Sequence, residues 1–544
     1  MTASIAGLLA ARADDGGPGL RTDDAAWTWA EVVAESAARA ALLDDLGLAG
    51  RHVGVLLENV PEFVFLLGAA ALSGSVVVGI NPTRRGEELA RDIRHTDCAV
   101  VLTDRAQAPL LDGLDLGGAE VRAVDVPAWL AAVAAHRGAP LPSALPGADA
   151  LYVLLFTSGS TGAPKAVQMS QGRAARTAAN AAAAFTPDSV LYCAMPLFHG
   201  NALLANLFPG LVAGATVVLR RRFSASAFLD DVRRHGCTYF NYVGRALSYL
   251  LAQPETPDDA DNRLQWCLGS EASPADRRAF RKRFGCHVVE GYSSSEGAVV
   301  IQPFSGMPPD ALGRPNEGTD VVVLDPETGE ECERARFGDG RVLLNPTEAI
   351  GEIVGRDGLS SFEGYYANPE ATAERGRDGW YWSGDLGYRD EEGTFYFAGR
   401  TADWLRVDGE NFAAGPVEAV LARYPGVRGV VVYAVPDPRT GDQVMAALEV
   451  GADDFDPAGF AAFLADQPDL GTKWAPRFVR LLDAIPLTAT GKVDRKPLRA
   501  ERWSTGDPVW WRPAPGQPYR RFTAADAEAL RSAFADAGRE GMLT

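Results

Sequence analysis

Apolar residues in the first part of the chain follow two patterns that alternate. Segments with apolar residues at helical spacing, such as Thr28 to Leu48, alternate with short continuous apolar runs that are typical of buried strands. These runs are His52 to Leu57, Ser75 to Ile80, Ala99 to Leu102 and Leu151 to Phe156. The alternation predicts βα units around a largely parallel sheet.

Strand-like runs continue beyond residue 200 and then change in character. The next four keep the βα spacing: Ala215 to Leu219, Tyr239 to Val243, Leu264 to Leu268 and His287 to Glu290. From about Gly313 the runs are shorter and are separated by Gly, Pro and Asp turns; they are Asp320 to Leu324, Gly340 to Leu344 and Thr394 to Ala398. We therefore expect a more antiparallel region that closes the large domain.

The chain is expected to divide near residue 400. Beyond this point Pro416 to Leu421, Val427 to Ala434 and Gln443 to Val450 alternate helix and strand on a smaller scale, and a helical run from Ala524 to Glu540 follows Trp510-Trp511. The pattern predicts an α/β protein with a large, multi-subdomain N-terminal domain of βα-layered sheets at residues 1–399. A hinge at 400–403 and a small α+β C-terminal domain at 404–544 complete the prediction.

Composition and charge narrow the class of partner. The 544 residues include 71 acidic and 52 basic side chains, for a net charge of -19. This excess argues against nucleic acid or an anionic membrane as the main partner. An anionic ligand must then be held by local donors.

Three features bear on the compartment. The six cysteines are widely scattered and contain no C-x-x-C pair, which favours a reducing compartment without structural zinc. Residues 1–20 have no sustained apolar core, so we expect no signal peptide. The uncharged stretch Phe63 to Pro82 is interrupted by glycines, and a buried helix, a turn and a buried strand explain it better than a transmembrane span. We therefore expect a cytoplasmic protein.

The stretch Thr157-Ser158-Gly159-Ser160-Thr161-Gly162-Ala163-Pro164-Lys165 follows the apolar run ending at Phe156. Its hydroxyls, glycine N–H groups and lysine can together hold a polyphosphate. It is not a Walker A loop, because Pro164 precedes the lysine and no Ser or Thr follows it. The alternative is a flexible Ser/Gly surface linker, although linkers seldom start from a core strand.

Five further segments follow this loop in a fixed order, and together they resemble the motifs of adenylate-forming enzymes. That superfamily contains acyl-CoA synthetases, nonribosomal-peptide adenylation domains and beetle luciferases. The segments are Gly269-Ser270-Glu271-Ala272-Ser273-Pro274, Gly291-Tyr292-Ser293-Ser294-Ser295-Glu296, Trp380 to Asp385, Arg400, and Pro486-Leu487-Thr488-Ala489-Thr490-Gly491-Lys492.

The resemblance implies a role for each matched residue. The loop residues Thr157 to Gly162 and Lys165 would hold the phosphates of ATP, and Gly269, Ser270 and Glu271 would contact adenine. Tyr292 would pack on adenine, the Ser295 hydroxyl would meet the α-phosphate and Glu296 would hold Mg²⁺. Asp385 would accept hydrogen bonds from the ribose hydroxyls, assisted by Arg400. Lys492, Glu296 and Lys165 are the implied catalytic residues.

Within the superfamily the chain is most similar to the fatty-acid-transport-protein and very-long-chain acyl-CoA synthetase branch, including its bacterial fatty-acid–CoA ligase relatives. The matching residues are Leu56 to Phe63, Gly79 to Gly86, Tyr242-Val243-Gly244 with Tyr249-Leu250-Leu251, Phe362 to Tyr365 and Gly409-Glu410-Asn411. The resemblance implies a hydrophobic acid as substrate and an acyl pocket at His199, Tyr242 and Gly269. It also implies CoA binding near Arg406 and Gly409 and a hinge at Ala402, and a homodimer is compatible with it.

The implied activity is that of an AMP-forming acyl-CoA ligase. ATP converts the acid to an acyl-adenylate, and the thiol of CoA then replaces AMP after the small domain rotates about the hinge. The chain departs from the family pattern at Ser293, Ala402 and Asp408.

Alternatives remain at the level of function and of single residues. The chain could be a ligase for a bulky secondary-metabolite acid, a ligase that works mainly in the thioester half-reaction, or a non-catalytic acyl-binding protein of lipid uptake. Fatty acids, sterol side-chain acids and polyketide or terpenoid acids all fit the pattern. Taken alone, Glu296 could be a solvated carboxylate, Tyr292 a core aromatic, Asp385 and Lys492 turn residues, and His199 a core histidine.

Overall fold

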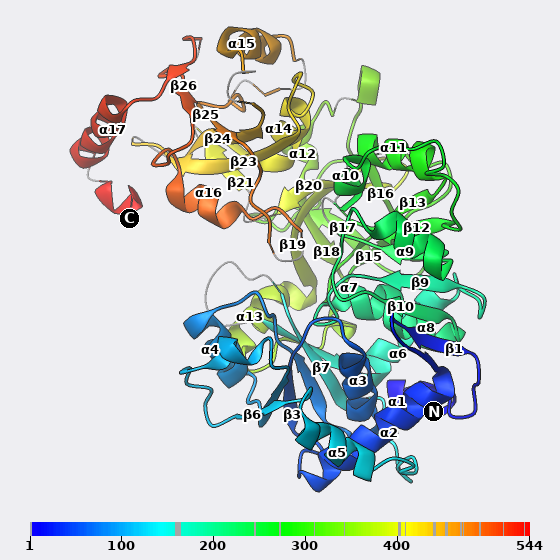
Figure 1. Cartoon of the computed structure of the whole chain (residues 1–544). Helices are drawn as coiled ribbons and strands as arrows, with labels where there is room; N and C mark the ends of the chain where they lie inside the picture. Colours follow the sequence, from blue (N-terminus) through cyan, green and yellow to red (C-terminus); the bar gives the residue numbers. More distant parts are fainter. Residues whose placement is uncertain are drawn as a thin grey trace. The chain divides into compact units, whose positions relative to one another are not determined.

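The computed structural model describes residues 3–157, 165–243, 246–270, 272, 274–308, 310–341, 343–400, 404–407, 410–438, 442–451, 455–467, 470–471, 473–488, 491–514, 516–537 and 539–543. The chain forms two compact units (Figure 1). Unit 1 is Met1–Ala298 with Leu359–Gly376, and unit 2 is Val299–Gly358 with Arg377–Thr544. The expected hinge residue Ala402 lies outside the described residues, so the domain boundary at 400–403 stays a prediction.

The first sheet of unit 1 is largely parallel, as predicted. Its order is β6 (Glu120–Ala123), β5 (Val100–Thr103), β3 (His52–Leu56), β4 (Val76–Gly79), β7 (Leu151–Phe156) and β8 (Ala166–Ser170). Strands β6 to β7 are parallel, and β8 pairs antiparallel with β7. No helix of the described chain follows the phosphate loop directly. The structure inserts β8 first, because this segment completes the sheet beside β7, and helix α6 (Gln171–Ala182) begins only after it.

The second sheet of unit 1 has the order β13 (His287–Glu290), β12 (Trp266–Gly269), β11 (Tyr239–Asn241), β9 (Val190–Cys193), β10 (Thr216–Leu219), β1 (Pro18–Arg21) and β2 (Ala26–Thr28). All neighbours are parallel except β1 and β2. The carboxyl ends of β11, β12 and β13 are therefore adjacent. In open α/β sheets ligands bind at this edge.

The uncharged stretch at residues 63–82 has the predicted form. Helix α3 (Pro61–Ser73) is almost fully buried, Gly74 ends it in the left-handed region with φ of 76°, and β4 follows. Helix α2 (Trp29–Asp45), which packs against α3, begins with a capping box between Thr28 and Glu31. Among the described residues, the model contains no helix of the length and apolarity that a membrane crossing requires.

The first sheet of unit 2 is antiparallel, as predicted. Its strands follow the order β15 (Val300–Gln302), β16 (Ala311–Pro315), β20 (Phe395–Arg400), β19 (Tyr381–Arg389), β18 (Gly351–Gly355) and β17 (Val321–Leu324). The predicted strand at Gly340 to Leu344 is wrong. This segment begins with a 3₁₀ turn, η3 (Asp339–Arg341), in which Arg341 has a φ of 65°. Leu343 makes only an isolated bridge to Phe337.

The rest of unit 2 has the predicted α+β character. A five-stranded sheet has the order β23 (Gly429–Pro436), β24 (Asp442–Glu449), β25 (Phe478–Leu482), β26 (Val509–Trp511) and β27 (Arg520–Arg521). The hairpin β21 (Trp404–Val407) and β22 (Glu410–Ala413) leads into α14 (Ala414–Leu421). The tail forms α17 (Ala524–Asp536), whose Phe534 is fully buried against the sheet core with Phe478 and Val509.

The remaining elements connect these sheets. In unit 1 they are α1 (Ile5–Ala10), α4 (Gly86–His95), η1 (Ala108–Leu111), α5 (Pro127–Ala135), α7 (Gly200–Ala202), the π-helix η2 (Leu203–Leu207), α8 (Phe208–Ala213), α9 (Phe228–His235), α10 (Ala246–Leu251), α11 (Pro274–Phe284), β14 (Tyr292–Ser293) and α13 (Pro369–Arg375), with η4 (Gly358–Ser360) at the border between the units. In unit 2 they are α12 (Pro346–Ala349), η5 (Arg377–Gly379), α15 (Pro457–Ala465), α16 (Arg495–Glu501) and η7 (Glu540–Leu543).

Candidate active site

The two ends of the predicted phosphate loop are joined in unit 1. Thr157 follows β7, Lys165 precedes β8, and the Thr157 N–H donates to the Lys165 carbonyl at 3.1 Å. The loop is therefore the tip of the β7–β8 hairpin. Its residues Ser158, Gly159, Ser160, Thr161 and Gly162 lie outside the described residues, so their predicted contacts to phosphate stay predictions.

A distant segment, residues 362–366, packs along the open edge of β8. The Gln168 N–H donates to the Gly364 carbonyl at 3.1 Å, and the Tyr366 N–H donates to the Ala166 carbonyl at 2.8 Å. The Glu363 carboxylate accepts hydrogen bonds from the Ser170 N–H and hydroxyl at 2.7 and 2.6 Å. These contacts bring Tyr365 to the base of the phosphate loop.

Tyr365 connects the loop lysine with the predicted magnesium ligand. Its hydroxyl donates to Glu296 Oε1 at 2.8 Å, and Lys165 Nζ lies 5.8 Å from the centre of its ring. Burial, reinforced by the Glu296 carboxylate, raises the pKa of Tyr365, so the phenol keeps its proton and donates it. Lys165 Nζ also lies 3.6 Å from the Glu374 carboxylate of α13. Thus the structure brings Lys165 and Glu296 to one site.

Glu296 fits the role of a magnesium ligand. Its side chain is only 6% exposed, and Tyr365 orients one of its two oxygens. Among the described residues there is no cluster of three or more His, Cys, Asp or Glu that could hold a metal by itself. Mg²⁺ in nucleotide enzymes is usually held by one or two carboxylates and the substrate phosphates, which matches a single buried glutamate beside a phosphate loop.

Arg173 of α6 anchors the segment that carries Glu296. Its guanidinium donates to the Ser295 carbonyl and to the Gln168 carbonyl of β8, the latter at 2.8 Å, and its side chain is 7% exposed. A Cβ built on Gly200 would lie only 3.1 Å from Ser295 Oγ. The Ser295 hydroxyl therefore faces the start of α7. The magnesium motif is thus tied to β8 and lies beside the segment that contains His199.

The predicted acyl pocket residues lie at the carboxyl edge of the second sheet. Gly269 ends β12, Tyr242 directly follows β11, and His199 precedes α7. A Cβ built on Gly269 would lie 2.2 Å from Cζ of Tyr242, so the tyrosine ring lies flat against this glycine. The structure therefore brings Tyr242 and Gly269 into direct contact.

His199 belongs to a segment that Asn59 holds in place. The side-chain amide of Asn59 donates to the Met195 carbonyl at 2.9 Å and accepts from the Leu197 N–H at 2.9 Å. The His199 ring is half-buried and lies 4.5 Å from the Phe198 ring. The π-helix η2 begins four residues later, and single turns of this kind often occur at functional sites.

The predicted adenine contacts are described in part. Ser270 follows β12, and Glu271 lies outside the described residues. Tyr292 is half-buried in β14, and Ser293, where the family has glycine, is exposed.

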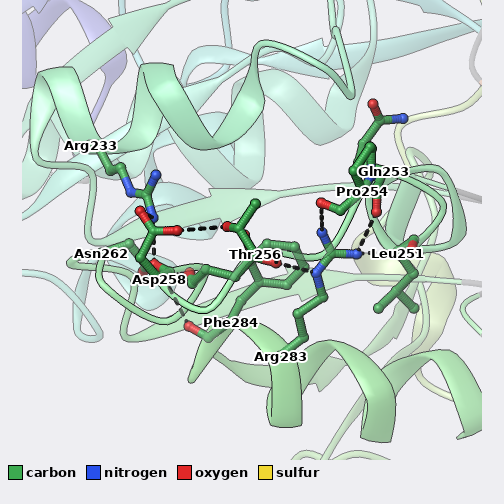
Figure 2. A network of polar contacts seen from close by, with 10 residues as sticks. Arg233, Leu251, Gln253, Pro254, Thr256, Asp258, Asn262, Arg283 and Phe284 are labelled. Carbon is green, nitrogen blue, oxygen red and sulfur yellow. Dashed lines mark hydrogen bonds and ion pairs between the residues drawn. The ribbon is translucent and has the colours of Figure 1, made fainter.

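The segment after α10 is held by two arginines (Figure 2). Arg283 of α11 donates to the carbonyls of Leu251, Gln253 and Pro254 at 2.9, 2.8 and 2.7 Å and to Asp259 at 2.5 Å. From the other side, Arg233 donates to the Asp261 carbonyl at 3.0 Å. These contacts fix the end of α10, which follows Tyr242 in the chain.

Unit 2 contains the predicted ribose residues. Asp385 of β19 and Arg400 of β20 are opposite each other in the antiparallel register. Gly384 has a φ of 74°, and its N–H donates to the buried Glu352 carboxylate at 2.6 Å. Glu352 of β18 thus fixes the backbone of β19 next to Asp385.

The predicted catalytic lysine also belongs to unit 2. Lys492 follows Gly491, which has a φ of 80°, and the Lys492 carbonyl accepts from the Thr488 N–H at 2.7 Å. Arg406 lies in β21 opposite Asn411, while Gly409 and Ala402 lie outside the described residues. The roles of these residues in CoA binding and rotation stay predictions.

Sequence reasoning missed three polar residues that position the site: Arg173, Glu290 and Glu352. Each acts on a segment far away in the chain or on a neighbouring strand. Glu290 ends a predicted strand directly before the magnesium motif, and its place at a strand end is the one signal that could have indicated it.

Two family patterns match the chain. The "AMP-binding enzyme" pattern covers residues 11–366, and the "AMP-binding enzyme C-terminal domain" pattern covers residues 416–492. Together they span both units.

Curated relatives are similar along nearly the whole chain. The "Steroid-22-oyl-CoA synthetase" of Rhodococcus jostii (strain RHA1) is 54% identical over 550 residues, which cover 99% of this chain and 99% of that protein. The "Medium/long-chain-fatty-acid--CoA ligase FadD17" of Mycobacterium tuberculosis (strain ATCC 25618 / H37Rv) is 45% identical over 503 residues, which cover 90% of this chain and 95% of the relative.

A solved structure has the same fold. ATP-bound MatB from Rhodopseudomonas palustris is 27% identical, with a TM-score of 0.81 and coverage of 92% of this chain and 98% of that chain. The predicted α/β fold with a large N-terminal and a smaller C-terminal domain is confirmed. The motif order, the Glu296 environment and these relatives agree. The chain belongs to the AMP-binding enzyme family and is an acyl-CoA ligase that works through an acyl-adenylate.

Proposed function

We propose that the acid activated by this chain is a bulky, hydrophobic carboxylate of the steroid side-chain type. The observation that carries the proposal is the 54% identity to the steroid-22-oyl-CoA synthetase over 99% of both chains. Because the similarity extends over nearly all of both chains, it includes the segments expected to line the acyl pocket, around His199, Tyr242 and Gly269.

In the first half-reaction, a carboxylate oxygen of the acid attacks the α-phosphorus of ATP and pyrophosphate leaves. Charge grows on the phosphate oxygens, so catalysis depends on fixed positive groups and hydrogen-bond donors. Lys165 and Lys492 supply ammonium groups, and the hydroxyls and N–H groups of the phosphate loop supply donors. Glu296 would hold Mg²⁺, which offsets phosphate charge when it is bound.

In the second half-reaction, the sulfur of CoA attacks the acyl carbon and AMP leaves. Asp385 and Arg400 hold the ribose, and Gly269, Ser270, Glu271 and Tyr292 hold the adenine through both steps. Rotation about Ala402 removes Lys492 and brings Arg406 and Gly409 to the thiol. The boundary at 400–403 belongs to this proposal.

A medium- or long-chain fatty acid is the second candidate substrate. The 45% identity to the FadD17 ligase over 90% of this chain favours it. Both acids need an extended apolar pocket, and they differ in the width that the pocket must admit.

We also propose a cytoplasmic location. All six cysteines are free thiols and five of them are buried, which suits a reducing compartment. A homodimer stays a prediction.

The experiment is a panel of acids that contains a steroid side-chain acid, a medium-chain and a long-chain fatty acid. Pyrophosphate release and thioester formation are measured separately. We expect kcat/KM for the steroid acid to exceed that for the fatty acids by about tenfold or more. A preference for a fatty acid would favour the second candidate. Conversion of synthetic acyl-adenylate alone would instead indicate a ligase of the second half-reaction.

A further inference from the structure

The contact between Tyr242 and Gly269 extends across three strands. Tyr242 follows β11, Gly269 ends the middle strand β12, and Glu290 ends β13 on its far side. The Tyr242 hydroxyl donates to Glu290 Oε1 at 2.9 Å. Neighbouring strands are about 4.8 Å apart, so this bond has to reach over β12. Only glycine leaves room for the ring, because a Cβ at position 269 would lie 2.2 Å from Tyr242 Cζ.

Glu290 is itself held by the turn that follows β12. The Ala272 N–H donates to Glu290 Oε1 at 2.7 Å, and Arg277 of α11 lies 3.9 Å from Oε2. Tyr242 is 1% exposed, and burial, with the Glu290 charge as a further cause, raises its pKa. The phenol therefore stays protonated and donates to the carboxylate. One carboxylate oxygen thus joins the Tyr242 ring to the predicted adenine turn.

Two other buried tyrosines of unit 1 have a different arrangement, whereas Tyr192 and Tyr365 also donate to carboxylates. The hydroxyls of Tyr152 and Tyr239 donate to backbone carbonyls, those of Leu67 and Ala205, at 3.1 and 2.8 Å. A tyrosine that only fills the core needs no more than such a carbonyl. Tyr242 instead lies over a glycine at the ligand-binding edge of a parallel sheet and is fastened by a carboxylate.

We propose that Glu290 is a positioning residue that holds the Tyr242 ring across Gly269 as the end wall of the acyl pocket, and that this pair sets the size of the acid the enzyme accepts. The inference rests on the proposed function, which puts the acyl pocket at this edge. The ring covers the apolar end of the pocket, and a larger acid has to displace it. The bond to Glu290 opposes that displacement.

The consequences differ between substitutions. Tyr242→Ala removes the wall, so the kcat/KM ratio of an acid bulkier than the steroid side-chain acid to the steroid side-chain acid itself should rise by about tenfold or more. Tyr242→Phe and Glu290→Ala keep the aromatic ring but remove its hydrogen bond to residue 290, so the same ratio should rise about threefold. Glu290→Gln keeps an acceptor oxygen for the phenol and should stay close to the wild-type ratio.

A matched control is Tyr192→Phe. Tyr192 lies in the same hydrophobic cluster and its hydroxyl is 3.4 Å from the Asp231 carboxylate, but it contacts neither Gly269 nor Glu290 in the described structure. It should leave the ratio unchanged. A purely structural role of Tyr242 would give the same result in all variants: lower stability and an unchanged ratio.

The experiment measures kcat and KM of both acids and of ATP for the wild type and the five variants. Thermal stabilisation of each protein by the same acids is measured in parallel, so that the fit of the acid is read even when turnover is slow. In Tyr242→Ala we expect a higher kcat/KM ratio and a changed pattern of thermal stabilisation by the acids. In Tyr242→Phe we expect the KM of ATP to be unchanged. A folded Tyr242→Ala variant with the wild-type ratio and the wild-type pattern of stabilisation overturns the inference. A wild type that neither converts nor is stabilised by any hydrophobic acid contradicts the proposed function instead.

Discussion

At the residue scale, the environment of Glu296 suits the role of metal ligand that we propose for it. The side chain is buried, one oxygen is oriented by the Tyr365 phenol, and the backbone next to it is held by Arg173. Such outer contacts fix the direction of a ligand before the metal arrives.

Glu296→Gln should slow pyrophosphate formation by about 10²–10³-fold, because a neutral amide replaces the carboxylate at the charged centre. The fold should survive, since the amide oxygen can still accept the hydrogen bond from Tyr365. The check is the rate of acid-dependent pyrophosphate release. As a control, Tyr365→Phe keeps the carboxylate and should raise the Mg²⁺ requirement by about 10–100-fold. A Glu296→Gln enzyme with the wild-type rate would remove Glu296 from the mechanism.

Gly269→Ala should lower the free energy of unfolding by about 1–3 kcal/mol, because its Cβ would overlap the Tyr242 ring. In a Tyr242→Ala background the ring is absent, so the same substitution should cost little. Chemical denaturation of the two single variants and the double variant gives this coupling. Additive costs would show that the ring and the glycine do not touch.

At the element scale, the connection between α10 and β12 depends on side chains from other elements. The Arg283 guanidinium of α11 donates to three backbone carbonyls between residues 251 and 254 and to the Asp259 carboxylate. Its side chain is 8% exposed. Arg233 of α9 holds the other side of the same segment but is 30% exposed. The segment at residues 252–263 is therefore held in place by these side chains and not by regular structure.

Arg283→Met should lower the free energy of unfolding by about 3–5 kcal/mol, because it leaves the buried Asp259 carboxylate without its cation. Arg233→Met, the matched variant at a more exposed pair, should cost about 1 kcal/mol or less. Thermal and chemical unfolding measure the difference, and amide hydrogen exchange at residues 251–262 should increase only in the Arg283 variant. Equal costs for the two variants would contradict the importance of burial here.

At the scale of the whole molecule, the residues assigned to adenylation belong to two compact units. Unit 1 contains Lys165, Tyr242 and Glu296, while Lys492 lies in unit 2 on a turn closed by hydrogen bonds between residues 488 and 492. A two-step ligase can use such a division, because the first half-reaction takes place at the α-phosphorus and the second at the acyl carbon, and each needs different groups.

Lys492→Ala should therefore separate the two half-reactions. Acid-dependent pyrophosphate release should fall by about 10²–10³-fold, because an ammonium group that stabilises the developing charge is lost. Conversion of synthetic acyl-adenylate and CoA to thioester should stay within about twofold of the wild type. Lys496→Ala, four residues away at the start of α16, serves as the control and should leave both rates unchanged. Equal losses in both half-reactions would contradict the assigned role of Lys492.

Local patterns were sufficient for many elements of the fold. The strands at Leu151 to Phe156 and His287 to Glu290 have the predicted bounds, and the helix expected from Thr28 begins at its capping box. A continuous apolar run indicates a buried strand, and a capping pattern indicates where a helix begins. Both depend on only a few neighbouring residues. The predicted strand at Gly340 to Leu344 failed because a 3₁₀ turn with a positive φ at Arg341 interrupts it.

By itself, the sequence determined the class of fold, the order of the nucleotide motifs and the type of reaction, because each depends on short segments. Only the tertiary structure decided which distant groups meet. Residues 166–170 become a strand through pairing with β7 and with residues 364–366, Tyr365 reaches Glu296, and Tyr242 reaches Glu290 across Gly269. The hydrogen bonds of Tyr242 with Glu290 and of Tyr365 with Glu296 join residues 48 and 69 positions apart, and no local pattern of polarity records such a partner.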